Sequence, residues 1–244
     1  MRLLLSLVIL LGVTYGITLV AQTMTRQNLE VPSELLGVYV APIYVAIPDV
    51  IQPDVFPFTA AGKQAFDDYD VFLQADNQED DCVMESMPSV LFTGDPMEIS
   101  HENNKIFIHY ERTNAVRTIY LDSASHQFQE QHPTGLGFSV GSWTGDEFWI
   151  ETTHMEEGVI RSNRPYPISE QGRISERYWL DSIDNKLHME LVVYDPQNYT
   201  HSVTFGRHWI PSKQDEVRSW DCISLGPRHS EPDIDELARM LEEL

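Results

Sequence analysis

Charged side chains interrupt several apolar stretches of this chain, and these are the residues whose types could do chemistry. They are four glutamates and four arginines within or beside sequences typical of strands: Glu98, Glu111, Glu151, Glu176, Arg117, Arg161, Arg177 and Arg207. A buried carboxylate or guanidinium group needs a partner, because removing a charge from water is costly. The pattern therefore predicts either a structural network of ion pairs or a polar lining for a ligand.

Proton transfer is the catalytic chemistry that these residues could support. A buried glutamate such as Glu111 or Glu151 would act as the base, and Arg117 would orient an anionic group of the substrate. His132, which precedes a glycine-rich stretch, is a further candidate base. Gly137-Phe138-Ser139-Val140-Gly141 formally matches the G-x-S-x-G elbow of hydrolases, but the β-rich sequence after it disfavours that reading.

Aromatic residues near these charges complete the set expected to bind a ligand, although such rings more often fill a core. The set is Glu98, Tyr110, Glu111, Arg117, His132, Trp143, Glu151, Arg161, Glu176, Tyr178 and Arg207. The sequence has no HExxH motif and no closely spaced histidine pair, so neither a metal nor another cofactor is expected.

The charge balance narrows the possible partners. Asp and Glu number 38 against 16 Lys and Arg, which gives a formal charge of -22 at pH 7. Such a surface repels phosphate backbones and anionic lipids. Nucleic acid is therefore excluded as a partner, and a membrane is expected only through the amino-terminal segment.

That segment predicts export. Met1 and Arg2 precede an apolar run, residues 3–21, that lacks Asp, Glu, Lys, Arg and His. The run is typical of a signal peptide cut after Ala21 or, if uncut, of an amino-terminal anchor. Either puts the remaining chain in the periplasm or outside the cell, where Cys82 and Cys222 are expected to form a disulfide, the alternative being two separate buried thiols.

Strands are the elements expected to position the charged residues. After Pro96 the sequence has a period of two: Ile106, Ile108 and Tyr110 would face one way, and the residues between them would face the other. Further runs occur at residues 116–121, 147–152, 173–180, 187–194, 201–210 and 217–223. They predict one all-β domain over residues 58–229, an antiparallel barrel or sandwich with a lipocalin-like meander.

The flanking regions have different patterns. Residues 22–57 hold five prolines and are expected to form an extended arm over the domain. Thr59 is expected to cap a short helix, and residues 230–244 to form an amphipathic helix that packs on the domain or binds a partner.

Several short motifs over roughly residues 58–223 occur together in this chain. With them it resembles an uncharacterised group of exported bacterial β-rich proteins. The main motifs are Pro96-Met97-Glu98-Ile99, Tyr110-Glu111, Arg117-x-Ile119-Tyr120, His132-Pro133, Gly141-x-Trp143-x-Gly145-Asp146, Glu151-Thr152, Glu176-Arg177-Tyr178 and Asp195-Pro196. Members carry Gly-His-Ser where this chain has Gly137-Phe138-Ser139. The resemblance implies a β-rich exported domain and carries no reaction with it.

The sequence is compatible with three functions. The leading expectation is an exported domain that binds a small apolar or amphipathic molecule in a barrel-like cavity, with no catalysis assigned. The second is a proton-transfer enzyme, an isomerase, cyclase or hydrolase. The third is a structural or interaction protein of the envelope that uses the arm or the carboxyl-terminal helix.

Overall fold

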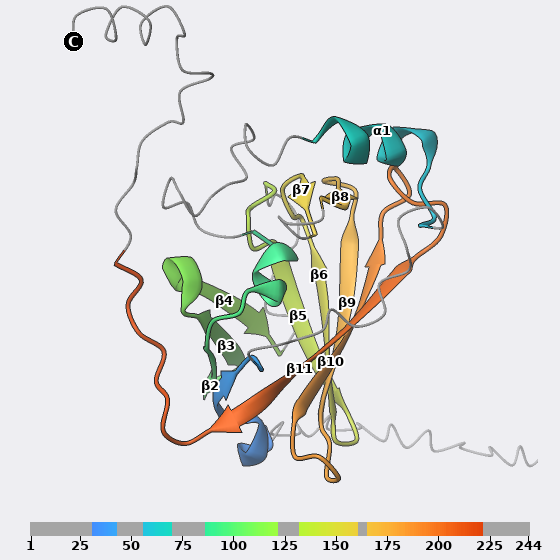
Figure 1. Cartoon of the computed structure of the whole chain (residues 1–244). Helices are drawn as coiled ribbons and strands as arrows, with labels where there is room; N and C mark the ends of the chain where they lie inside the picture. The colour runs from blue at the N-terminus through green and yellow to red at the C-terminus, as the bar shows by residue number, and fades with distance from the viewer. Residues whose placement is uncertain (1–30, 43–55, 70–85, 122–131, 161–164, 222–244) are drawn as a thin grey trace, which may run out of the picture. The chain divides into compact units, whose positions relative to one another are not determined.

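Nine strands close on themselves in the computed structural model, which describes residues 31–42, 56–69, 86–121, 132–160 and 165–221 (Figure 1). Around the barrel the order is β1-β11-β10-β9-β6-β5-β4-β3-β2. The strands are β1 (Gly37–Val40), β2 (Met97–Glu102), β3 (Lys105–Tyr110), β4 (Ala115–Tyr120), β5 (Phe138–Thr144), β6 (Glu147–Thr153), β9 (Arg173–Leu180), β10 (Leu187–Tyr194) and β11 (Val203–Ser212). The prediction of an all-β fold is confirmed in its barrel form.

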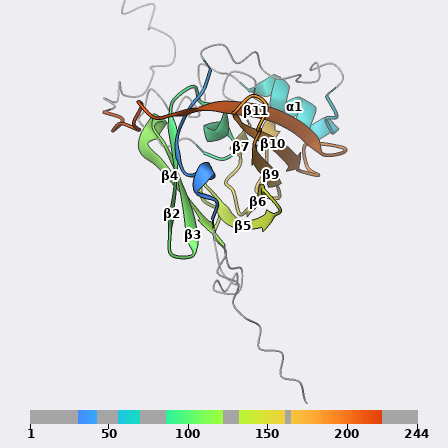
Figure 2. The same ribbon diagram turned by 90° about the horizontal axis from the view of Figure 1, so that it is seen from below.

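Alternation of side chains explains why these sequences form the barrel wall. On β3, Ile106, Ile108 and Tyr110 are buried while the residues between them are half-buried, and β10 repeats this with Leu187, Met189, Leu191 and Val193. Because successive side chains of a strand point to opposite faces, one side chain in two fills the interior. Seen from below, β11 runs along one side of the ring, with β2 to β4 and β5 to β6 on other sides (Figure 2).

One pairing in the barrel differs from the expected antiparallel meander. Strands β4 and β5 are parallel, and only two residue pairs join them, Ile119 with Ser139 and Tyr120 with Val140. Every other neighbouring pair in the barrel is antiparallel and has at least three residue pairs. Because β4 and β5 run in the same direction, the residues between them cannot form the tight hairpin turn that joins antiparallel neighbours. We call this short pairing the β4–β5 seam.

Two further segments differ from expectation. Gly37–Val40, within the range expected to form an arm over the domain, is strand β1 of the wall and pairs with both β2 and β11. The strand predicted at residues 217–223 is wrong for residues 217–221, which form no strand. Side-chain acceptors hold this backbone instead: Arg218 N–H donates to Glu111 Oε2 and Trp220 N–H donates to Asn114 Oδ1.

The described residues also form one α-helix and three short helical turns. Helix α1 (Ala60–Asp68) begins after Thr59, whose hydroxyl accepts a hydrogen bond from Gly62 N–H at 3.0 Å. The other helical turns are η1 (Ser33–Leu35), η3 (Ser89–Phe92) and η4 (Arg112–Asn114), and a separate small sheet pairs β7 (Gly158–Val159) with β8 (Pro167–Ile168). Within the described ranges, no helix combines the length and the apolar character needed to cross a membrane.

The turn η3 belongs to the barrel core. Val90 and Leu91 are each 1% exposed and join the same hydrophobic cluster as the inward residues of the strands. From β11, Arg207 donates hydrogen bonds to two carbonyls of this segment, Leu91 O at 2.8 Å and Thr93 O. The buried guanidinium group of Arg207 therefore holds η3 against the inward side of β11 by hydrogen bonds.

Several expectations fall outside the described residues. These are the amino-terminal leader at residues 1–21, most of the arm, Arg161, the cysteines Cys82 and Cys222, and the helix expected at residues 230–244.

Candidate functional site

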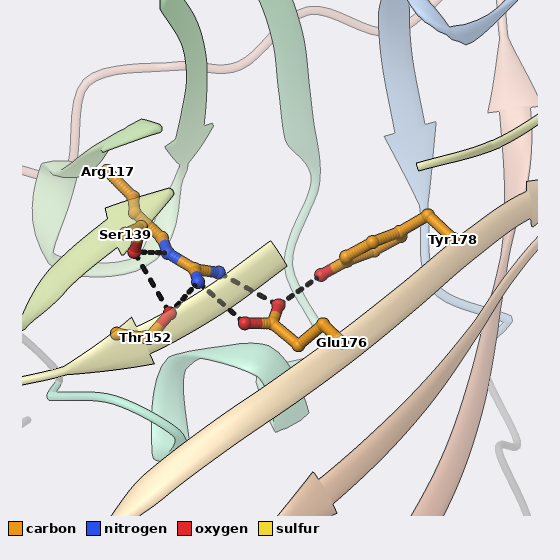
Figure 3. Close-up of polar contacts among 5 residues, drawn as sticks. All are labelled: Arg117, Ser139, Thr152, Glu176 and Tyr178. Atoms are coloured by element: carbon orange, nitrogen blue, oxygen red, sulfur yellow. Dashed lines mark hydrogen bonds and ion pairs between the residues drawn. The ribbon is translucent and has the colours of Figure 1, made fainter. Parts of the chain in front are cut away.

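A fully buried ion pair crosses the interior of the barrel. Arg117 on β4 and Glu176 on β9 are 1% and 0% exposed. Arg117 Nη1 donates to Glu176 Oε2 at 2.9 Å and Nη2 donates to Oε1 at 2.6 Å, so the two groups meet side on (Figure 3). This two-point geometry is the strongest arrangement of these two groups.

Two hydroxyl groups complete the surroundings of the guanidinium group. Arg117 Nε donates to Ser139 Oγ on β5 at 3.0 Å, and Nη2 also donates to Thr152 Oγ1 on β6 at 2.6 Å. The two hydroxyls lie 3.0 Å apart, and Ser139 and Thr152 are partners in the β5–β6 register. Side chains of four consecutive strands of the wall, β4, β5, β6 and β9, therefore form one network.

The carboxylate has a third partner on its own strand. Tyr178 OH donates to Glu176 Oε2 at 2.8 Å. Burial raises the pKa of Tyr178 well above its ordinary value, and the charge of Glu176 adds to this, so Tyr178 remains a donor at neutral pH. Burial alone would lower the pKa of Arg117, but the Glu176 carboxylate outweighs it and raises that pKa above the ordinary value. The pair is therefore a fixed ionic link at neutral pH.

Tyr110 lies beside this network. It is 2% exposed, and its hydroxyl makes no hydrogen bond of ordinary distance and angle among the described residues, although Arg117 is near enough to lower its pKa by hydrogen bonding. Tyr110 is opposite Ala115 in the β3–β4 register, so it is a diagonal neighbour of Arg117 on the inward side. Burial raises the pKa of Tyr110 to about 12, an effect that the charges of Arg117 and Arg207 partly offset. Both cations are therefore part of the surroundings of this hydroxyl.

The structure brings together five residues of the predicted ligand-binding set; Arg161 lies outside the described residues, and the other members lie apart from these five. Tyr110, Arg117, Glu176, Tyr178 and Arg207 are buried in the interior. Glu98 on β2 and Glu151 on β6 are exposed, because they occupy the outward positions of their strands, so neither is the buried carboxylate that was expected. We call the five buried residues the interior polar cluster.

The remaining candidates lie elsewhere. Glu111 follows β3, where it accepts a hydrogen bond from Arg218 N–H, and His132 is exposed. The structure describes no contact among Glu111, Glu151 and His132, the three candidate catalytic residues. Trp143 is half-buried and its ring stacks on Phe148 at 4.7 Å.

Arg177 is not part of the interior network either. It lies on the outward side of β9, where it pairs with Glu147 and Glu190 and covers the ring of Trp179.

Ser139 and Thr152 are the residues of the buried network that the sequence did not predict. Small hydroxyl side chains are common in strands, and nothing in their neighbourhood marks them as partners of an arginine. The alternation of side chains along β5 and β6 could have indicated that Ser139 and Thr152 point inward. That they lie opposite each other follows only when the register of the two strands is known.

Another buried carboxylate was not predicted. Asp195 is 1% exposed and accepts hydrogen bonds from Ser169 N–H, Ser169 Oγ, Gln197 N–H and Asn198 Nδ2. These bonds join the loop after β10 to the loop after β8, which is a structural role.

One group of side chains could hold a metal ion. At the turn between β9 and β10, ligand atoms of Asp181, Asp184 and His188 lie within 4.8 Å of one another. Each is already engaged by the turn: Asp181 accepts from Ile183 N–H, and Asp184 accepts from Lys186 N–H and contacts His188 Nε2 at 3.1 Å. These bonds account for the group as a turn-stabilising cluster.

Chemically, the interior polar cluster can hold a group by hydrogen bonding more readily than it can transfer a proton. Glu176 already accepts three hydrogen bonds, so acting as a base would require breaking them. The Tyr110 hydroxyl needs no such rearrangement.

Comparison of the chain with protein-family models, with curated proteins and with solved structures finds no match.

Proposed function

We propose that this chain is an exported domain that binds a small amphipathic molecule inside its barrel, with no catalytic step. The observation that carries the proposal is the Tyr110 hydroxyl, which is 2% exposed and makes no hydrogen bond of ordinary distance and angle among the described residues. Leaving a buried hydroxyl unpaired costs about 1–3 kcal/mol. A bound molecule or an ordered water that supplies the partner would explain such a group.

The remaining interior supplies an apolar surface for such a molecule. Around the interior polar cluster the inward side chains are aliphatic, including Ile106, Ile108, Ile119, Ile150 and Leu191. A polar group fixed at one point of an otherwise apolar interior suits a ligand with one polar end.

Entry of a ligand requires part of the wall to move, because the described interior side chains are buried and packed on one another. Two places favour such movement. The β4–β5 seam is held by two residue pairs, the fewest in the barrel, and Ser139 of this seam bonds to Arg117. The turn η3 contributes Val90 and Leu91 to the core and is held there by hydrogen bonds from Arg207.

The proton-transfer alternative has less support. It needs a carboxylate and a cation converging in a cleft that solvent can reach. Glu176 and Arg117 do converge, but they are 0% and 1% exposed. The envelope-protein alternative rests on the arm and the carboxyl-terminal helix, which lie mostly outside the described residues. Export remains a proposal that rests on the apolar run at residues 3–21.

Thermal unfolding of the full-length chain with a panel of amphipathic and apolar compounds tests the proposal. A ligand of the folded state raises the melting temperature as its concentration increases. We expect at least one compound to do so for the wild type, and the Tyr110→Phe variant to lose most of that rise.

Tyr39→Phe is the matched control. Tyr39 is 1% exposed in the same interior, but its hydroxyl donates to Leu35 O at 2.8 Å. Its removal should lower the melting temperature without ligand and leave the ligand-dependent rise intact. If no compound shifts the wild type, or if both variants respond as the wild type does, the proposal is wrong.

A further inference from the structure

We infer that His188, His208 and Asp184 bind a divalent transition-metal ion such as Zn²⁺ on the outer face of the barrel. Asp181 supplies a fourth ligand. The inference follows from the β10–β11 register, from the distances at the turn between β9 and β10 and from the ring that supports His188. Because the two histidines occupy outward positions of their strands, the site is separate from the interior and independent of the proposed function.

The two histidines lie side by side on neighbouring strands. His188 is directly opposite His208 in the antiparallel β10–β11 pairing, and both are half-buried. Their ring centroids are 5.6 Å apart. Directly opposite residues of antiparallel strands have Cβ atoms only about 4.5–5.5 Å apart, so two imidazole groups at such positions can reach one ion. Imidazole is the commonest metal ligand among the side chains. The two residues are distant in the sequence, so the pair is recognised only from the register.

The Asp184 carboxylate already has the spacing from His188 that an ion requires. Its Oδ1 and Oδ2 lie 3.2 and 3.1 Å from His188 Nε2. Two ligand atoms on one tetrahedral Zn²⁺ lie about 3.3 Å apart, because each is about 2.0–2.2 Å from the metal. An ion between these atoms takes the place of the hydrogen that joins them, and the proton of the neutral ring is then on Nδ1.

Asp181 completes the set from the end of β9. Ligand atoms of Asp181, Asp184 and His188 lie within 4.8 Å of one another. Asp181 Oδ1 accepts hydrogen bonds from two N–H groups of the turn, which leaves Oδ2 for an ion. These bonds hold the turn without His208, so the turn alone does not account for a second histidine beside His188.

Trp179 supports the His188 ring from the neighbouring strand β9. The two residues are opposite each other in the β9–β10 register, and their rings stack with centroids 5.3 Å apart and an interplanar angle of 18°. In the register of the three strands, His188 therefore lies between Trp179 and His208. Packing that fixes the orientation of a ligand reduces the cost of assembling a metal site.

Lys186 competes with an ion for the Asp184 carboxylate. Its Nζ lies 3.3 Å from Asp184 Oδ2. A metal ion has to displace this ammonium group, and the flexible side chain of lysine allows it to move into solvent. Removing the lysine charge should therefore tighten metal binding.

The ligand types select the class of ion. Imidazole nitrogen suits Zn²⁺, Cu²⁺ and Ni²⁺, whereas Ca²⁺ and Mg²⁺ prefer sites made of oxygen atoms alone. A set of two imidazole groups and two carboxylates therefore favours Zn²⁺ over Ca²⁺ and Mg²⁺.

Isothermal titration of the full-length chain with Zn²⁺, and separately with Ca²⁺ and Mg²⁺, tests the inference. Salt at about 0.15 M weakens the general attraction of cations to the acidic surface. We expect one Zn²⁺ site that binds at least tenfold more tightly than either of the other ions. Zn²⁺ should also raise the melting temperature, because an ion that links the turn to β11 binds only the folded chain.

Variants of the ligands test the assignment of the residues. Loss of an outer partner of a ligand already weakens a metal site by about 10- to 100-fold, so His208→Ala should weaken Zn²⁺ binding at least tenfold. Asp184→Asn, at an exposed position, should do the same and keeps an oxygen that accepts from Lys186 N–H. Lys186→Gln should bind Zn²⁺ more tightly than the wild type. Circular dichroism checks that each variant is folded.

His109→Ala is the matched control. His109 is also a half-buried residue at an outward position of a strand, but it is opposite Glu98 on β2 and Val116 on β4, so no histidine faces it. This variant should bind Zn²⁺ as the wild type does.

Three results would overturn the inference. The first is no Zn²⁺ binding by the wild type, and the second is binding of Ca²⁺ or Mg²⁺ as tight as that of Zn²⁺. The third is a dissociation constant that His208→Ala and Asp184→Asn leave unchanged, or that His109→Ala raises equally, because the ion would then be held elsewhere. None of these results bears on binding inside the barrel.

Discussion

Arg117 and Glu176 meet across the barrel interior through hydrogen bonds of 2.9 and 2.6 Å, although two strands, β5 and β6, separate their own strands in the wall. Ser139 and Thr152 from these intervening strands bond to the same guanidinium group. The pair therefore ties together the part of the wall that contains the weakly paired β4–β5 seam.

Breaking the pair on one side should be strongly destabilising. Glu176→Gln leaves the Arg117 charge buried without a counter-ion, and Arg117→Met leaves the Glu176 carboxylate buried without one. Each change should lower the free energy of unfolding by about 3–5 kcal/mol. The double variant buries no unpaired charge and should cost clearly less than the sum of the two. Urea unfolding measures all three, and additive costs would show that the two groups do not interact.

Ser139→Ala should weaken the barrel at its seam. The change removes the acceptor of Arg117 Nε and leaves a buried donor unpaired, which costs about 1–3 kcal/mol. Ser142→Ala on the same strand is the control, because Ser142 is exposed and should change the unfolding free energy by less than about 0.5 kcal/mol. Similar effects of the two alanines would argue against the network.

Gly141 is required where β5 passes the opposite side chains. A Cβ atom at this position would lie 2.6 Å from Phe148 Cζ and 2.8 Å from Ile119 Cγ2. Gly141→Ala should therefore cost about 1–3 kcal/mol through overpacking. At Gly206 on β11 the nearest atom, Met189 O, would be 3.9 Å from the new Cβ, so Gly206→Ala should change stability by less than about 0.5 kcal/mol. Equal unfolding midpoints would contradict the packing described for β5.

Buried tyrosines should make the fold sensitive to alkaline pH. Burial raises the pKa of Tyr39 and of Tyr110 to about 12, whereas an unfolded tyrosine ionises at about 10. Between these values the unfolded chain binds fewer protons than the folded chain, so the free energy of unfolding falls as pH rises. The stabilisation is complete below about pH 10 and is lost on approach to pH 12. Denaturant unfolding at successive pH values should show this decline, with a smaller slope for Tyr110→Phe; a flat profile would contradict it.

The sequence alone predicts much of the wall but not its closure. Period-two alternation located β3, β4, β6, β9 and β10 closely. It missed β1, because the surrounding prolines obscure a strand of four residues. The parallel seam could not be predicted, since it depends on where β5 returns after a long connection.

The candidate site was predictable to a similar degree. The alternation that places Arg117 between Ala115 and Ile119 turns it inward, and the same rule places Glu98, between Met97 and Ile99, outward. If each charged residue had been assigned to the inward or outward side by this alternation, Arg117 would have been predicted as buried and Glu98 as exposed. Which of the inward residues meet could not be derived, because Arg117 and Glu176 are 59 residues apart and on strands that are not neighbours.

Native mass spectrometry of the full-length chain, equilibrated with the compounds of the thermal-unfolding panel, is the most direct test of ligand binding inside the barrel. We expect a complex of one protein with one compound that dissociates when the protein unfolds, is much reduced for Tyr110→Phe and is retained for Tyr39→Phe. A wild-type spectrum that shows only the bare protein mass with every compound offered, or an adduct equally abundant in all three proteins, would contradict binding at Tyr110.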